Sequence, residues 1–416
     1  MRVSAAFSRL LRLDGIWVRA VRFEARRIVV VVALRRRHLV CPDCGHRASG
    51  RFDTRPVDST WRHLDLGIWR LEVHARLRRL WCPIHHARTE AVPFARAGSD
   101  FTRDFEALVA WLATRTDKST ITRLVRVNWR TVGRIIERVS DDELDPGRLN
   151  ELFDIGIDEV SWASQHRYLT LVTDHRRRRI VWGAEGHDSR TADRFFAALG
   201  QQRCEQIETI TLDMGPGYAK SARAHAPQAV IAIDPFHVAK AASDALDDVR
   251  REYWNKLRDL GDHDAARRFK GARWALLKRP DNLNDTQAAT LRRLHAAGGE
   301  VWRAYTLKEA LRSIFSPGLS VDDIELLIDR FISRARRSRL QSFVKLAATI
   351  TKHRDGILAA VRLGATNARA EALNNKVRLI VRRAYGFHSA PAALALIMLS
   401  CGPVDLHLPH ELHPHP

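Results

Sequence analysis

The pattern of apolar and polar positions is sharpest between residues 153 and 234. Short apolar runs bounded by turn residues predict five strands, at Phe153–Ile157, Tyr168–Thr173, Arg179–Trp182, Ile207–Leu212 and Ala229–Ile233. Helical periodicity separates the later strands, over Asp188–Gly200 and Gly217–Ala226. The predicted order of elements is therefore β-β-β-α-β-α-β-α.

Three antiparallel strands followed by parallel crossovers is the element order of the ribonuclease-H-like fold. We therefore expect an α/β core of that topology, with a mixed five-stranded sheet in which the first and fourth strands are neighbours. The stretch from His237 to about Leu363 has a mostly helical pattern and is too long for a loop. It predicts a large all-helical insertion in this core, at about residues 240–365.

The first hundred residues carry strand-like runs, such as Ile28–Leu34, among many arginines, and predict a small β-rich module with a basic face. Helical periodicity follows over Phe105–Val139. Within it, Ser119–Leu124 and Trp129–Val139 are two short helices that predict a helix-turn-helix. Three arginines at four-residue spacing are expected to face outward from the second helix, toward a DNA groove or its phosphates: Arg130, Arg134 and Arg138.

Charge and composition narrow the classes of function. The chain has 69 Lys and Arg against 48 Asp and Glu, a net charge of +21, which favours a polyanionic partner and nucleic acid first. The longest apolar runs fall short of the ~20 residues that span a bilayer. The basic N-terminus lacks an apolar signal core, and five cysteines do not make a disulfide framework. We expect a cytoplasmic protein without a membrane partner.

Paired soft ligands predict a zinc site. Cys41 and Cys44 form a Cys-x-x-Cys pair, and Cys82 and His85 form a second pair at the same spacing. Two such pairs suit a tetrahedral structural Zn²⁺, with the chain between them looping out as a β insertion. His86 is an alternative to His85 as the fourth ligand.

These patterns predict four parts of the chain. A zinc-binding, DNA-binding module covers residues 1–100, and the helix-turn-helix covers residues 101–145. An acidic, Pro-Gly-containing linker at 141–149 leads into the catalytic domain over residues 150–402. Residues 403–416, which end in alternating His and Pro, are expected to form a flexible tail.

Two aspartates follow strands that the predicted topology makes adjacent. Asp158 is expected to end the first strand and Asp213 the fourth. Adjacent carboxylates repel each other unless a cation lies between them, and hard oxygen ligands favour Mg²⁺ or Mn²⁺. Two such ions can activate a nucleophile and stabilise the leaving oxygen of a phosphodiester. Asp234, which ends the fifth strand, is an alternative to Asp213, and His237 beside it is a candidate phosphate or metal-ligand contact.

Glu371 is the candidate for a third carboxylate. On a helix, Glu371, Asn375, Arg378 and Arg382 share one face, while Leu373, Val377 and Ile380 share the other. The first face offers a metal ligand, an amide and two cations, as expected beside bound DNA. The candidate DNA contacts in this segment are Lys376, Arg378 and Arg382, and its candidate auxiliary catalytic or phosphate-contact residues are Asn374 and Asn375.

Several ordered motifs resemble one family, the transposases of the ISL-three family of bacterial insertion sequences. They are the Cys-Pro-x-Cys module and residues 156–162, 211–218, 234–237, 273–278, 371–376 and 383–388. The resemblance covers about residues 38–402. It implies a DDE transposase with Asp158, Asp213 and Glu371 as its acidic triad. It also implies that the N-terminal parts bind the terminal inverted repeats of the element. Cys82-x-x-His85 departs from the family pattern, in which the second pair is Cys-x-x-Cys.

The sequence thus predicts metal-dependent DNA strand cleavage at transposon ends, followed by attack of the freed 3′-hydroxyl on target DNA. A dimer or larger assembly is expected, because two ends must be brought together. The alternative is a sequence-specific DNA-binding regulator with a decayed catalytic domain, although the intact acidic residues disfavour it. Another ribonuclease-H-like nuclease, such as a junction resolvase, has less need of the N-terminal sequence-reading parts.

Overall fold

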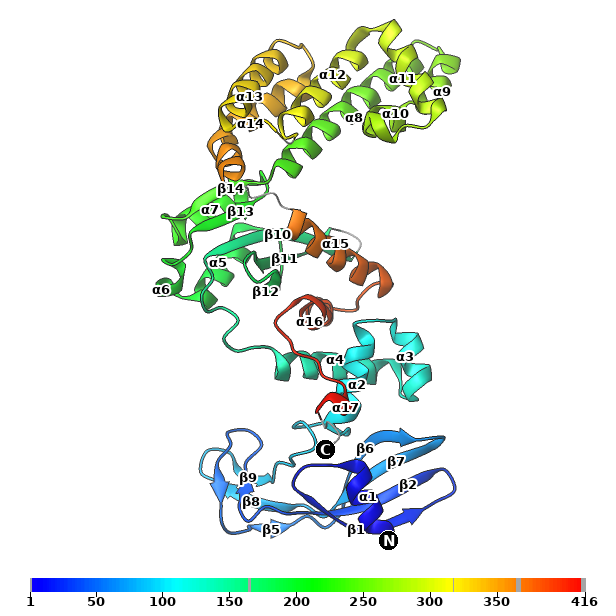
Figure 1. The fold of residues 1–416 in the computed structure, drawn as a ribbon, viewed down its shortest axis with the longest axis vertical. Coiled ribbons are helices and arrows are strands. Elements are labelled where there is room, and N and C mark those ends of the chain that lie inside the picture. The colour runs from blue at the N-terminus through cyan, green and yellow to red at the C-terminus, as the bar shows by residue number, and fades with distance from the viewer. Residues whose placement is uncertain (1, 164–165, 317, 364–367, 413–416) are drawn as a thin grey trace. The chain divides into compact units, whose positions relative to one another are not determined.

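The computed structural model describes residues 2–163, 166–316, 318–363 and 368–412, and it divides the chain into two compact units (Figure 1). The terminal unit combines residues 1–146 with residues 379–416. The central unit comprises residues 147–378. None of the helices within the described ranges is long and apolar enough to cross a membrane.

The first hundred residues of the terminal unit are β-rich, as predicted. Their elements are α1 (Val3–Leu11), β1 (Ile16–Phe23), β2 (Arg27–Leu34), β3 (Leu39–Val40), β4 (Arg47–Ala48), β5 (Asp53–Thr54), β6 (Ser59–Leu66), β7 (Trp69–Ala75), β8 (Arg78–Cys82) and β9 (His86–Thr89). Strand order β1-β2-β7-β6 makes one sheet, β5-β8-β9 a second, and β3-β4 a short hairpin. The predicted strand at Ile28–Leu34 is confirmed as β2, whereas the sequence pattern does not predict α1.

Three helices follow: α2 (Arg103–Ala113), α3 (Lys118–Val125) and α4 (Trp129–Glu143). Their N-caps are Thr102, Asp117 and Asn128, each of whose side chains accepts a backbone N–H of the first turn. The two predicted short helices are confirmed as α3 and α4. Because α4 continues to Glu143, the predicted acidic linker begins as helix.

The end of the chain completes the terminal unit. Helix α16 (Ala390–Cys401) is almost entirely apolar and packs against α4. Beyond it, Val404 forms a β-bridge with Leu144, and α17 (Pro409–Leu412) lies in the segment predicted as a flexible tail. Residues 413–416 of that segment lie outside the described residues.

The central unit contains the predicted five-stranded mixed sheet, with strand order β12-β11-β10-β13-β14. The strands are β10 (Asp154–Ala163), β11 (Arg167–Asp174), β12 (Arg179–Glu185), β13 (Thr209–Leu212) and β14 (Val230–Ile233). The first three pair antiparallel, while β10, β13 and β14 pair parallel. Helices α5 (Ser189–Leu199), α6 (Gln201–Cys204) and α7 (Pro216–His225) connect them. The predicted neighbourhood of the first and fourth strands is confirmed.

Residues 235–362 form helices and short connections wherever the structure describes them, which confirms the predicted helical character of this stretch (Figure 1). The elements are α8 (Pro235–Asp259), α9 (His263–Lys270), α10 (Arg273–Leu277), η1 (Pro280–Asn282), α11 (Asp285–Ala297), α12 (Gly299–Ile314), α13 (Val321–Arg336) and α14 (Gln341–Arg362). The bundle returns to the sheet through α14, which packs on β14. A Cβ at Gly356 would lie 2.7 Å from Ile233 Cγ1, so the glycine permits this close approach.

Helix α15 (Ala368–Arg383) follows, and the boundary between the two units falls within it, after Arg378. Its buried residues include Val377 and Ile380, as the predicted apolar face requires.

Candidate functional site

Two aspartates lie together where the parallel pairing of β10 and β13 ends. The last paired residues are Gly156 and Thr211, so Asp158 and Asp213 each stand two residues further along neighbouring strands. Both line one small pocket, together with His237 and Asn374. Asp158 lies inside β10 rather than at its end, because β10 continues to Ala163 through its pairing with β11. The prediction that the strand ends at Asp158 is therefore wrong, whereas the predicted adjacency of Asp158 and Asp213 is confirmed.

Hydrogen bonds fix the orientation of both carboxylates. Asp158 Oδ1 accepts the Glu159 backbone N–H at 2.7 Å, and Asp213 Oδ1 accepts the Gly215 N–H at 2.9 Å. A Cβ at Gly215 would lie only 2.9 Å from Asp213 Oδ1, so the glycine makes room for this turn. The second oxygen of Asp158 accepts a hydrogen bond from the Asn374 side-chain amide of α15.

The electrostatics of the pair favour a bound cation. Burial raises the pKa of Asp158, and the charge of Asp213 raises it further, while the Glu159 N–H, His237 and Arg378 act in the opposite direction. Burial also raises the pKa of Glu159, with Asp213 again adding to the effect. Asp158 and Glu159 are thus held where negative charge is costly, and a divalent ion with oxygen ligands offsets that cost.

Glu159 is a carboxylate near the pair that the sequence pattern does not single out. The sequence feature that could have pointed to Glu159 is its position directly after Asp158 in the same strand. Alternation along a strand sends neighbouring side chains to opposite faces, which argues against a shared site. Here, however, the negative charge of Asp213 raises the pKa of both Asp158 and Glu159.

Asp234 and His237 begin α8. Asp234 is buried and caps the helix, because its Oδ1 accepts the Phe236 N–H at 2.9 Å. Its other oxygen lies 3.8 Å from His237 Nε2. His237 lines the pocket of Asp158 and Asp213, so of this predicted pair the histidine is the one placed at the carboxylates.

The remaining candidates lie on α15. Glu371 falls within this helix, but its side chain lies outside what the structure describes. Asn375, Lys376, Arg378 and Arg382 are exposed, and Arg378 donates to Asn375 Oδ1 at 3.2 Å. Exposed cations on this helix suit contact with a polyanion.

Gly156 holds β10 close to its neighbours beneath the carboxylates. A Cβ at this position would lie 2.7 Å from His175 Nε2 and 2.9 Å from Thr211 Oγ1, two atoms that share a 2.6 Å hydrogen bond. Because this space is filled, Gly156→Ala is expected to destabilise the protein by about 1–3 kcal/mol. Urea denaturation measures the change. Gly271→Ala is the matched control, since its Cβ meets only Arg268 O at 3.8 Å. Equal stability of the two variants would contradict the close packing.

A second candidate site lies in the terminal unit. The ligand atoms of Cys41, Cys44, Cys82 and His85 all lie within 4.8 Å of one another. Cys44 Sγ and Cys82 Sγ are 3.5 Å apart, and His85 Nδ1 lies 3.7 Å from Cys82 Sγ and 3.8 Å from Cys41 Sγ. These separations suit the edges of a tetrahedron with metal–ligand distances of about 2.0–2.3 Å. The cluster is therefore a Cys₃His candidate metal site.

The geometry of the hairpin favours His85 over His86 as the fourth ligand. His85 belongs to the cluster, whereas His86 starts β9 and its ring lies 5.4 Å from that of Trp81. The two Cys-containing segments adjoin β3-β4 and β8-β9, so two hairpins distant in sequence supply the four ligands.

The predicted arginine row on α4 is only partly exposed. Arg130 and Arg134 are exposed. Arg138 is instead half-buried and ion-paired with the buried Glu106 of α2. The expectation that Arg138 faces outward is therefore wrong, because a buried carboxylate on the neighbouring helix needs a partner. Arg96 contacts the same carboxylate at 3.2 Å, so this cluster joins α2 to α4.

Comparisons with known proteins agree with this architecture. A family model described as a transposase matches residues 155–396, and one described as the helix-turn-helix domain of transposase family ISL3 matches residues 90–140. The transposase for insertion sequence element IS1557 of Mycobacterium tuberculosis is 39% identical over 396 residues, covering 90% of this chain and 88% of the relative. The transposase for IS1001 of Bordetella parapertussis is 29% identical over 359 residues, covering 84% and 85%. The chain therefore belongs to the ISL3 family of insertion-sequence transposases.

Proposed function

We propose that this transposase binds the terminal inverted repeats of its element, cuts DNA there in a metal-dependent reaction and joins the freed 3′-hydroxyl to target DNA. The observation that carries the proposal is the register of β10 and β13, which sets Asp158 and Asp213 at one pocket. Strand order β12-β11-β10-β13-β14 with its antiparallel and parallel pairs supports a ribonuclease-H-like core.

Asp158, Asp213 and Glu371 are proposed as the acidic triad. Positions 371 and 374 are one helical turn apart in α15, and Asn374 of this helix binds Asp158, which supports Glu371 as the third member. The hard oxygen donors fit Mg²⁺ or Mn²⁺. When bound there, two such ions would activate a water or 3′-hydroxyl and would stabilise the leaving oxygen of the phosphodiester.

The other side chains position the reacting groups. Asn374 orients Asp158 through its amide, and His237, which lines the same pocket, is proposed to contact the scissile phosphate. The exposed cations of α15 are proposed to neutralise the phosphates on either side. Asn375 is proposed as a further contact, since it already accepts a hydrogen bond from Arg378.

The N-terminal part of the terminal unit is proposed to recognise the end sequence. Residues 1–100, with Zn²⁺ as a structural ion, and the helix-turn-helix of residues 101–145 form the end-binding part, in which Arg130 and Arg134 face the DNA. Residues 150–402, with the helical insertion, form the catalytic domain. We propose that the protein acts in the cytoplasm on nucleoid DNA, as a dimer or larger assembly that holds two ends.

A mating-out or plasmid assay in cells tests this function. A selectable marker is placed between two copies of the element's end, and the chain is supplied from a separate plasmid. The proposal predicts that the marker moves to new DNA sites only when the chain is present. Specific end binding without any movement of the marker would favour the regulator with a decayed catalytic domain.

Asn374→Ala is expected to lower the rate of cleavage about 10–100-fold, because a hydrogen bond to a charged group contributes about 1.5–3 kcal/mol. The loss should appear in the rate at saturating DNA, with the dissociation constant for the end unchanged. Single-turnover cleavage of an end duplex measures both. Asn150→Ala, at an exposed position of the same unit, is the control. An unchanged rate for Asn374→Ala would remove its positioning role.

A further inference from the structure

The hairpin between β6 and β7 ends in an exposed apolar tip. Leu66 pairs with Trp69, and Gly67 and Ile68 make the two-residue turn. Gly67 has a φ of +61°, which glycine adopts without strain and which this kind of turn uses. Ile68 is 80% exposed, and Leu66 and Trp69 are also exposed. Three neighbouring apolar side chains thus face solvent at the end of the β6-β7 hairpin.

Arginines surround this tip. Arg26, Arg70 and Arg126 line a cleft of about 380 Å³ together with Ile68 and Trp69. Arg26 and Arg70 are exposed and form no ion pair with any residue that the structure describes. An exposed apolar tip between two unpaired guanidinium groups is complementary to a negatively charged surface with a gap that an apolar side chain can enter.

Hydrogen bonds hold the hairpin to the helix-turn-helix. Arg126, in the turn between α3 and α4, donates to Ile68 O at 2.9 Å and to Asp65 Oδ2 at 3.0 Å. Arg62 of β6 donates to the other oxygen of Asp65 at 2.8 Å and to Val125 O at 3.3 Å. The hairpin tip is therefore fixed relative to the turn that precedes α4.

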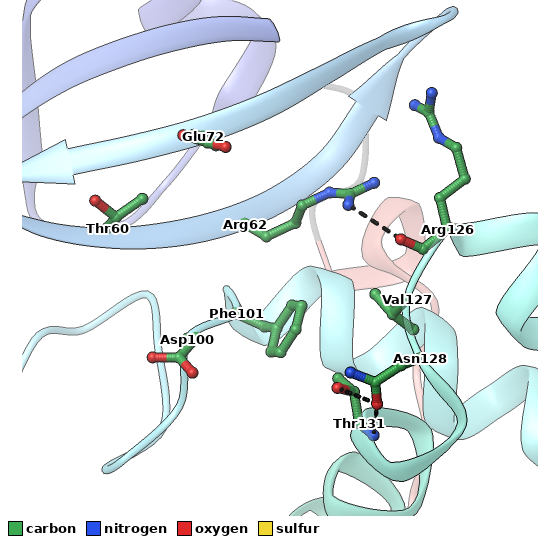
Figure 2. A pocket seen from close by; sticks show the side chains of 9 residues that line it. All are labelled: Thr60, Arg62, Glu72, Asp100, Phe101, Arg126, Val127, Asn128 and Thr131. Atoms are coloured by element: carbon green, nitrogen blue, oxygen red, sulfur yellow. Dashed lines mark hydrogen bonds between the residues drawn. The ribbon is translucent and has the colours of Figure 1, made fainter. Parts of the chain in front are cut away.

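Figure 2 shows a second cleft beside this contact, of about 520 Å³, lined by residues from β6, from β7 and from the first turn of α4. Arg62 points toward the main chain of Arg126, and Asn128 caps α4 by binding Thr131. The start of α4 and the hairpin therefore border one continuous surface of the terminal unit.

Both acidic side chains of the β6-β7 hairpin are already paired. Asp65 is bound by both Arg62 and Arg126. Glu72 lies 2.9 Å from Arg27 and 3.2 Å from His74. With these carboxylates neutralised, the unpaired charges beside the tip, on Arg26 and Arg70, are positive.

We propose that the tip of this hairpin, residues 66–69, inserts into the minor groove of the DNA next to the major groove that α4 reads. The inference rests on the proposed function, since it needs α4 to bind the element's end. Apolar side chains that enter the minor groove unstack a base step and bend the duplex, while adjacent arginines bind the phosphates and the groove floor. Ile68 is the wedge, and Arg26 and Arg70 flank it.

The test compares wild type with Ile68→Ala and Arg70→Ala on a duplex carrying the element's end, with a scrambled duplex beside it. Leu260→Ala is the matched control, because Leu260 is an aliphatic side chain 81% exposed in the central unit. Affinity is measured by fluorescence anisotropy at several salt concentrations. Bending is measured by energy transfer between dyes at the two duplex ends, and unstacking by 2-aminopurine placed beside the α4 site.

We expect Ile68→Ala to lose about tenfold in affinity for the end duplex, together with the bend and the 2-aminopurine signal. Arg70→Ala should reduce the salt dependence of the binding affinity for both duplexes, by an amount that corresponds to about one phosphate contact. Leu260→Ala should match wild type in every readout. Melting temperatures confirm that the variants are folded.

Two other outcomes separate the inference from the function on which it rests. If wild type binds the end specifically and Ile68→Ala binds and bends it equally well, the hairpin inference is wrong and the proposed function stands. A change of oligomeric state in Ile68→Ala with unaltered DNA binding would also overturn the inference and assign the tip to a second copy of the chain. If wild type prefers neither duplex, the proposed function fails, and the inference fails with it.

Discussion

The Asp158→Ala variant is expected to lose DNA cleavage by at least about 10³-fold while binding the element's end as wild type does. A metal ligand stabilises the transition state by several kcal/mol, and about 4 kcal/mol corresponds to 10³ in rate. Asp158 is half-buried at the pocket, and its two oxygens are oriented by the Glu159 N–H and by Asn374. A water in place of the carboxylate restores neither the charge nor this geometry.

Gel-based cleavage and anisotropy on the same labelled duplex measure the two effects. Asp154→Ala is the control from the same strand, since the Asp154 side chain forms an ion pair with the half-exposed Arg176 and does not line the pocket of Asp158. That pair contributes at most about 1 kcal/mol to stability, so its loss should leave cleavage intact. Cleavage by Asp158→Ala at the wild-type rate would refute its role as a metal ligand.

Removing one ligand of the Cys₃His cluster should have the next largest effect. His85→Ala is expected to weaken zinc binding by more than about 100-fold, since even the outer partners of a metal ligand are worth about 10–100-fold. Few apolar side chains are buried next to the cluster, chiefly Leu39 and Leu80. The metal should therefore hold this region together, and its loss should also abolish end binding.

His86→Ala is the matched control, because the neighbouring histidine packs near Trp81 instead of joining the cluster. Metal content by mass spectrometry, and the absorption of a Co²⁺-substituted protein, report the ligand set directly. Retention of zinc by His85→Ala and its loss from His86→Ala would reverse the assignment. Zinc in neither the wild type nor the variants would reject the metal site.

Local patterns were sufficient to predict the sheet and its most important consequence. Apolar runs place all five strands, and their order, which is that of the ribonuclease-H-like fold, makes the first and fourth strands neighbours. The adjacency of Asp158 and Asp213 follows from that order. The full length of β10 could not be predicted in this way. Its second half contains the exposed polar residue Ser161 and is held in place by pairing with β11.

Features that depend on distant partners were not predictable from local pattern. Arg138 follows Arg130 and Arg134 at the four-residue spacing of an exposed helix face. Its side chain instead forms an ion pair with the buried Glu106 of another helix, which the local pattern does not indicate. The contact of Asn374 with Asp158 joins residues 216 positions apart. The packing of α16 against α4 joins the end of the chain to its first third. The spacing from Cys82 favours His85 but leaves the adjacent His86 as an alternative, and the β8-β9 hairpin distinguishes the two side chains.

Cleavage of a labelled duplex carrying the element's own end tests the central claim most directly. Wild type and Glu371→Ala are compared with Mg²⁺ and then with EDTA, and end binding is measured in parallel. The account predicts nicking at the end by wild type with Mg²⁺, and none with EDTA or in the variant, with binding retained. Cleavage that persists in EDTA or in Glu371→Ala would contradict the mechanism based on carboxylates and metal ions. Specific binding without cleavage by wild type would contradict the claim that the protein is a DNA-cleaving enzyme.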